Sequence, residues 1–112
     1  MLAQDGGSNS AIVSLSDEVI VYEDTIRKCA KKYDIEDYVS LLQAIMMQES
    51  GGKENDPMQA SESGYNTKYP RVPNGITDPE YSIEVGTHAF SDCLKKAKVK
   101  DSSDTERIYL AL

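Results

Sequence analysis

Apolar residues recur every three or four positions in several stretches of the chain, which is the period of an amphipathic α-helix. The first stretch follows a polar lead, and either Ser14 or Ser16 is suited to cap its start. We predict a helix from there to about Lys32. Its apolar side consists of Val19, Tyr22, Ile26, Cys29, Ala30 and Tyr33.

The segment EDYVSLLQAIMMQESGG, residues 36–52, contains the most hydrophobic of the predicted helices. Gly51 and Gly52 are expected to end it, because glycine readily adopts the left-handed conformation that follows a helix. The hydrophobicity of this helix predicts a central place in the fold. Its broad apolar face carries Tyr38, Leu41, Leu42, Ile45 and Met46.

A third helix is predicted to start at Asp78 and Pro79, a capping residue followed by a first-turn proline, and to run to about Lys98. One side of it carries Ile83, Gly86, Thr87, Phe90, Cys93, Leu94 and Ala97. The last segment, DSSDTERIYLAL, predicts another helix that begins at Ser103 or Asp104 and is still in progress at Leu112. No segment alternates with period two, so the predicted fold is all-α.

Residues 51–79 are rich in Gly, Pro, Asn, Asp and Ser and predict a long irregular loop, with a short helical turn after Pro57. Loops of this length in a compact domain are either disordered or functional. The tyrosines and prolines of GYNTKYPRVP, residues 64–73, supply rigid apolar surface for packing. We therefore expect this loop to carry function.

The composition excludes some classes of partner. The 112 residues suffice for one domain, and a formal charge of −7 argues against nucleic acid or an anionic membrane as the main partner. Residues 1–15 lack the basic start and long apolar region of a signal peptide. We expect them to be a flexible lead or linker before a single domain over residues 16–112.

Two cysteines and one histidine do not have the spacing of a zinc site or a redox pair, so we expect no metal and no cofactor. Cys29 and Cys93 both fall on predicted apolar stripes, where a thiol commonly behaves as a small hydrophobic group. A disulfide between the two helices is the alternative, which an extracytoplasmic location would permit.

Glu49 is the most informative acidic residue. It follows Leu42, Ile45 and Met46 on the same helix face, which predicts a half-desolvated carboxylate at the negative end of the helix dipole. Such a setting suits a general acid that must still hold a proton. The alternative is a solvated side chain at the rim of the core. Glu62, in the second Glu-Ser-Gly tripeptide, lies in a polar loop and is expected at the surface.

Asp56 has two interpretations. Directly before Pro57 it is an ordinary cap for the turn PMQA. It also follows Glu49 by seven residues across a glycine-bearing loop, near enough to face it over a cleft. A separation of about 6.5–9.5 Å would admit a water and suit inversion at a sugar, whereas about 5 Å would suit a retaining nucleophile.

The motifs QESG (48–51), DPMQ (56–59), SES (61–63) and SIxxG (82–86) resemble the lysozyme-like domain of Gram-positive bacterial cell-wall hydrolases. That family belongs with the goose-type lysozymes and soluble lytic transglycosylases. Its marks are a Glu-Ser at a helix end, a Gly-Leu-Met-Gln segment and a later Asn-Ile-x-x-Gly helix. The resemblance spans residues 38–112 and implies an all-α, lysozyme-like fold.

This resemblance implies a muramidase, which would cleave the β-1,4 bond between N-acetylmuramic acid and N-acetylglucosamine in peptidoglycan. Glu49 would be the catalytic acid and Asp56 a second acidic residue needed for activity, positioning water or steadying positive charge on the sugar ring. A functional Asp56 favours water as nucleophile, and hence hydrolysis over transglycosylation. The implied substrate-binding residues are Ser50, Met58, Gln59 and Ser61.

Tyr65 and Tyr69 are further candidates for substrate binding, because tyrosine rings stack on sugars; packing within the core or loop is the equal alternative. The resemblance also implies an extracytoplasmic location, an association with conjugative elements and an NlpC/P60 peptidase domain that follows in the parent protein. Related domains continue into a Tyr-Asn-x-Gly segment, so we expect the C-terminal part of the fold to be missing. The other candidate functions are a lytic transglycosylase and a non-catalytic glycan-binding or scaffold fragment.

Overall fold

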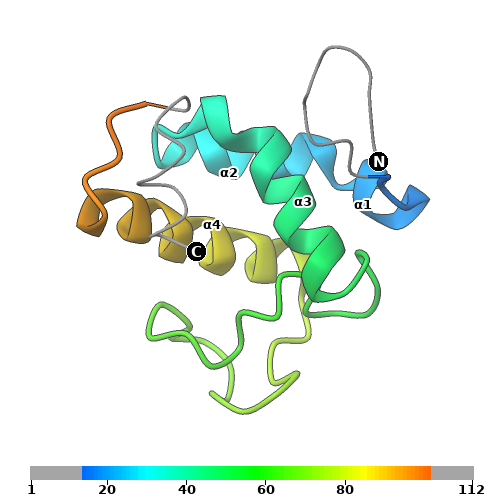
Figure 1. Cartoon of the computed structure of the whole chain (residues 1–112). Coiled ribbons are helices and arrows are strands. Elements are labelled where there is room, and N and C mark those ends of the chain that lie inside the picture. Colours follow the sequence, from blue (N-terminus) through cyan, green and yellow to red (C-terminus); the bar gives the residue numbers. More distant parts are fainter. Residues whose placement is uncertain (1–13, 102–112) are drawn as a thin grey trace.

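A computed structural model describes residues 14–101 of the chain. Its elements are α1 (Asp17–Val21), α2 (Glu23–Lys32), the 3-10 turn η1 (Glu36–Tyr38), α3 (Val39–Glu49) and α4 (Pro79–Lys96). Figure 1 shows α2 and α3 on one side of α4 and the long loop between α3 and α4 on the other. Within the described part of the chain there is no strand, and the predicted all-α fold is confirmed. The helix predicted from Ser103 or Asp104 lies outside the described residues.

The predicted first helix is two helices that meet at Tyr22. Ser16 caps α1 as expected, since its hydroxyl accepts a hydrogen bond from the Val19 amide at 3.2 Å. The same hydroxyl donates to the Gly51 carbonyl at 2.6 Å. The junction has neither proline nor glycine. We attribute the break to tertiary contacts, because α1 is fastened to the end of α3 whereas α2 packs on both α3 and α4.

The end of α3 is set by the two glycines, as predicted. Gly51 has φ +68° and its amide donates to the Met47 carbonyl at 3.1 Å, which satisfies one of the last carbonyls of the helix. Gly52 has φ +80° and lies directly against α1, where an added Cβ would be 2.7 Å from the Val19 nitrogen. Gly51 is therefore needed for its left-handed backbone. Gly52 is needed for the same backbone conformation and also because α1 leaves no room there for a side chain.

These two glycines form a matched pair for mutation. Gly51→Ala is expected to cost about 1 kcal/mol of unfolding free energy, because only the left-handed backbone is strained. Gly52→Ala is expected to cost about 2 kcal/mol, because a backbone clash with α1 is added to the same strain. Urea unfolding of both variants measures the difference. Equal losses would show that the contact with α1 contributes nothing.

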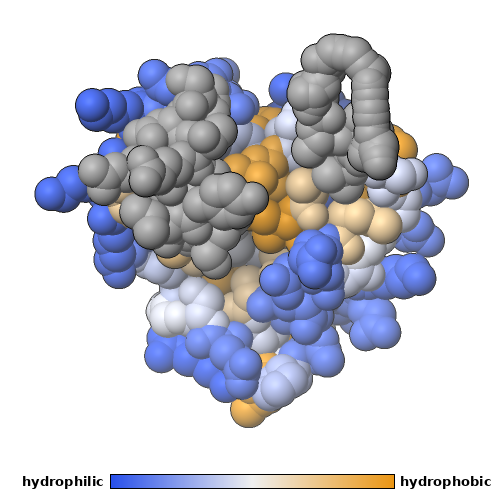
Figure 2. All heavy atoms as spheres, viewed as in Figure 1, coloured by the Kyte–Doolittle hydropathy of each residue, from blue (hydrophilic) through white to orange (hydrophobic). Residues whose placement is uncertain are grey.

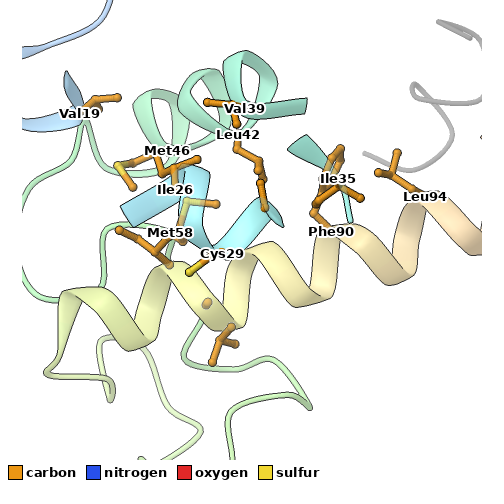
Figure 3. Packing of buried hydrophobic residues seen from close by; sticks show 14 of the residues in the cluster. Val19, Ile26, Cys29, Ile35, Val39, Leu42, Met46, Met58, Phe90 and Leu94 are labelled. Atoms are coloured by element: carbon orange, nitrogen blue, oxygen red, sulfur yellow. The ribbon is translucent and has the colours of Figure 1, made fainter. Parts of the chain in front are cut away.

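The start of α4 also follows the prediction. The Asp78 carboxylate accepts a hydrogen bond from the Glu80 amide at 3.1 Å, Pro79 occupies the first turn, and Lys95 and Lys96 lie in the last turn. The core is formed between α4 and the layer of α2 and α3 above it. In Figure 3, Ile26, Met46 and Met58 lie toward one end of α4, and Ile35, Phe90 and Leu94 lie toward the other.

Both cysteines are free thiols, so the disulfide alternative is not realised in this structure. Cys29 is buried between helices and belongs to the core, whereas Cys93 is partly exposed. Burial, followed by the nearby negative charge of Glu84, raises the pKa of the Cys29 thiol.

We expect the two thiols to react with iodoacetamide at different rates. The thiolate is the reactive form, and burial both hinders access to Cys29 and raises its pKa. Peptide mass spectrometry after brief labelling at mildly alkaline pH should find modified Cys93 well before modified Cys29. Equal labelling in the folded protein would contradict the packing of α2 on α4.

Candidate active site

A cleft of about 470 Å³ lies where α3, α4 and the long loop meet. Its volume is within the range of about 300–1,000 Å³ that is typical of small-ligand sites. On the face shown in Figure 2, apolar residues gather near the centre and polar residues lie toward the edge of the molecule. The lining residues are Leu41, Ala44, Ile45, Gln48, Glu49, Met58, Gly86 and Phe90.

Glu49 is the last residue of α3 and lies at the rim of this cleft. Its side chain is exposed, so the expected half-desolvated carboxylate is not observed. The reason is its position at the end of the helix: Met46, one turn earlier, is fully buried, but beyond Glu49 the chain turns away at Gly51. Among the described residues that line the cleft, Glu49 supplies the one carboxylate.

Asp56 is buried, with 2% of its surface exposed. One carboxylate oxygen accepts hydrogen bonds from the Ala60 amide at 2.9 Å and the Ser82 hydroxyl at 2.7 Å. The other accepts from the Ser61 amide and the Ser61 hydroxyl. Asp56 therefore caps the turn that follows it, as in the first of its two interpretations. It is not among the residues that line the cleft with Glu49.

Met58 does reach the cleft, and two contacts with α4 hold it there. Its amide donates to the Ser82 hydroxyl at 3.1 Å. Its side chain packs against Gly86, where an added Cβ would lie 2.8 Å from the Met58 Cβ. The absence of a side chain at Gly86 thus makes room for Met58.

Ser50, Gln59 and Ser61 hold the loop together and are not among the cleft residues. The Ser50 hydroxyl donates to the Pro57 carbonyl at 2.6 Å. The Gln59 side-chain amide donates to Asn74 Oδ1 at 3.0 Å. The Ser61 hydroxyl accepts from the Ile76 amide at 2.9 Å, besides donating to Asp56. These hydrogen bonds connect different parts of the loop that follows α3.

Tyr65 and Tyr69 are partly buried and pack against other rings, and neither is among the residues that line the cleft. The ring centroids of Tyr65 and His88 are 4.0 Å apart, and those of Tyr69 and Tyr81 are 5.4 Å apart. A hydrogen bond to Asp92, followed by desolvation, raises the pKa of the Tyr65 hydroxyl. Because two residues correspond to about 200° around a helix, His88 projects from a different side of α4 than Gly86. Tyr65 and His88 line a different pocket from the one that contains Glu49 and Gly86.

The cleft also contains residues that the sequence analysis did not propose as functional. Leu41 and Ile45 were assigned to the core, and Phe90 to the buried face of α4. One signal was present in the sequence: Leu41, Ile45 and Glu49 follow one another at intervals of four, so they form a single row along α3. That row is one wall of the cleft.

Neither a metal cluster nor a membrane helix is found in residues 14–101. No three His, Cys, Asp or Glu side chains are grouped so that they could hold a metal ion. No helix among these residues is both long and apolar enough to cross a membrane.

Comparison with known proteins identifies the fold. A family model described as lysozyme-like matches residues 16–110. The chain belongs to the lysozyme-like family. This confirms the resemblance recognised from the QESG, DPMQ and SIxxG motifs.

Two curated proteins of Bacillus subtilis are similar to this lysozyme-like chain. The bifunctional muramidase/DL-endopeptidase CwlT is 39% identical over 92 residues, which are 82% of this chain and 26% of CwlT. The uncharacterized membrane protein YocA is 37% identical over 79 residues, which are 70% of this chain and 33% of YocA. The chain thus spans between a quarter and a third of the curated relatives that it matches.

A solved structure shows the same fold. It is the crystal structure of a Staphylococcus aureus protein described as similar to a lipoprotein of the NLP/P60 family, with a TM-score of 0.69 and 43% identity. The similarity covers 77% of this chain and 27% of that one. In that structure, too, the matched region is one part of a longer chain.

Proposed function

We propose that this lysozyme-like domain is a muramidase that cleaves peptidoglycan between N-acetylmuramic acid and N-acetylglucosamine, with Glu49 as general acid. The observation that carries the proposal is the position of Glu49, which supplies the one carboxylate that residues 14–101 place at the rim of a largely apolar cleft of about 470 Å³. The similarity to CwlT, a muramidase by its name, supports the same reaction.

In this proposal a glycan strand lies along the cleft with its apolar sugar faces on Ile45, Met58 and Phe90. Glu49 gives its proton to the glycosidic oxygen as the bond to C1 breaks. Water adds to C1, and its released proton restores Glu49. The bound glycan excludes solvent from a carboxylate that is exposed in the free protein, which strengthens its interaction with the leaving oxygen.

Lytic transglycosylation is the second candidate, and the burial of Asp56 favours it. Asp56 was expected to support water as the nucleophile, but both of its carboxylate oxygens are already hydrogen-bonded. One accepts from the Ala60 amide and the Ser82 hydroxyl, and the other accepts from the amide and hydroxyl of Ser61. In transglycosylation the C6 hydroxyl of muramic acid attacks C1 and no water is needed. A cleft with one carboxylate is sufficient for that reaction.

The location and partners follow from the same proposal. CwlT is named as both muramidase and endopeptidase, and the similar S. aureus chain is described as of the NLP/P60 family. We propose that the domain acts outside the cytoplasm on peptidoglycan glycan strands and that the parent protein carries an NlpC/P60 peptidase domain after it.

Digestion of purified peptidoglycan in ¹⁸O-labelled water, followed by mass spectrometry of the products, tests the proposal. A muramidase releases fragments with reducing ends that carry the label, whereas a transglycosylase releases unlabelled 1,6-anhydro ends. Soluble glycan strands that bind without any release of fragments would contradict both reactions and indicate a glycan-binding domain.

A further inference from the structure

We infer that Asp56 is a positioning residue, which shapes the glycan cleft through Ser82 and Met58 and does not touch the substrate. The inference rests on the proposed function, since it concerns how the same cleft is maintained. It differs from the role that the family resemblance implied, in which the carboxylate of Asp56 positions water or steadies charge on the sugar.

The contacts form a continuous path from Asp56 to the cleft. The Ser82 hydroxyl, on α4, donates to the Asp56 carboxylate at 2.7 Å and accepts from the Met58 amide at 3.1 Å. The Met58 side chain then lines the cleft that Glu49 borders. Ser82 is fully buried and Met58 is 6% exposed, so this path is shielded from water. Buried hydrogen bonds of this kind hold their geometry firmly, because no solvent can replace a lost partner.

A second branch leads from Asp56 away from the cleft. Ser61 donates its amide and its hydroxyl to the other carboxylate oxygen. The Ser61 hydroxyl in turn accepts from the Ile76 amide at 2.9 Å, which fastens the end of the long loop near α4. One carboxylate therefore ties together the start of the loop, its end and α4.

The number of partners leaves little capacity for a substrate. Four hydrogen bonds already reach the two Asp56 oxygens, and an ionised carboxyl group has about four acceptor sites. With 2% exposure, Asp56 offers no surface to a sugar or to an attacking water. Removal of the carboxylate would instead release Ser82, and with it the backbone of Met58.

The test uses Ser82→Ala, with Ser61→Ala as the matched control. Each variant removes one hydroxyl donor from Asp56, but only Ser82 also holds Met58. Asp56→Asn is the third variant. It keeps the shape of the side chain but replaces one acceptor oxygen of the carboxylate with an NH2 group, which donates hydrogen bonds. Ser82→Ala retains the carboxylate itself, so the test stays informative if Asp56→Asn fails to fold.

The kinetic readout separates positioning from catalysis. For Ser82→Ala we expect the KM for soluble glycan strands to rise about tenfold while kcat stays within about twofold, because only the fit of the glycan is altered. Asp56→Asn should show the same pattern, and the double variant should be no worse than the poorer single variant. Ser61→Ala should change KM less than Ser82→Ala does.

The inference is overturned if Asp56→Asn lowers kcat by about 10² or more with KM unchanged, while Ser82→Ala behaves as the native protein; such a loss is typical of a missing acid or base. A structural readout is independent of turnover. The ¹³C-methyl NMR signal of Met58, assigned through Met58→Leu, should shift in Ser82→Ala and stay in place in Ser61→Ala. An unmoved signal in Ser82→Ala also overturns the inference.

These readouts keep the two proposals distinct. If the native chain cleaves no peptidoglycan, the proposed function fails. The Met58 signal and the affinity for glycan strands, measured by calorimetry, would still show whether Asp56 and Ser82 shape the cleft.

Discussion

Glu49→Gln is expected to abolish the loss of turbidity that the proposed muramidase activity would cause in a cell-wall suspension. Glutamine cannot give a proton to the leaving oxygen, and general acid catalysis accounts for about 10²–10⁴ in rate. The fold should be unaffected, because the Glu49 side chain makes no hydrogen bond or ion pair with any other residue between 14 and 101. We expect Glu49→Gln to change the unfolding free energy of the protein by less than about 0.5 kcal/mol.

The second Glu-Ser-Gly tripeptide provides the control. Glu62 is exposed in the loop and is not part of the cleft, so Glu62→Gln should retain native activity. A Glu49→Gln protein that clears the suspension as fast as the Glu62→Gln protein would remove Glu49 from the acid role.

Gly86→Ala is expected to reduce activity at least about tenfold and to destabilise the protein by about 2 kcal/mol. Alanine normally stabilises a helix interior by about 1 kcal/mol relative to glycine. Here its Cβ would lie 2.8 Å from the Met58 Cβ and 3.1 Å from the Met58 Cγ and Cε. An overpacking cost of about 3 kcal/mol outweighs the gain in helix propensity. Because the nearest atom is the Met58 Cβ, the loop itself must move, and the cleft changes with it.

Gly64→Ala is the control for Gly86→Ala. A Cβ at Gly64 would meet no atom within 4 Å, so this substitution should leave both unfolding free energy and activity close to native values. Thermal unfolding and the turbidity assay measure the two effects in each variant. If Gly86→Ala were more stable than the native protein and fully active, Met58 could not be held against α4 as the structure shows.

Local sequence signals determined where most helices begin and end. Ser16 and Asp78 accept hydrogen bonds from the first turns that follow them, and Gly51 ends α3 with a left-handed backbone. These features depend on neighbouring residues alone, so the pattern of residues suffices to predict them. The break at Tyr22 was not predicted, because its cause is the contact of α1 with the end of α3, a segment about thirty residues away.

For the site, the sequence by itself determined the family and the candidate acid: the QESG and DPMQ motifs identify the lysozyme-like domain, and Glu49 ends an amphipathic helix. Only the tertiary structure decided which neighbours share its cleft. Asp56 is seven residues from Glu49 along the chain, but its carboxylate turns inward to Ser61 and Ser82, because a buried polar group must be hydrogen-bonded. Ser61 is only five residues from Asp56, but Ser82 lies 26 residues away on α4, and no local pattern of residues contains that distant partner.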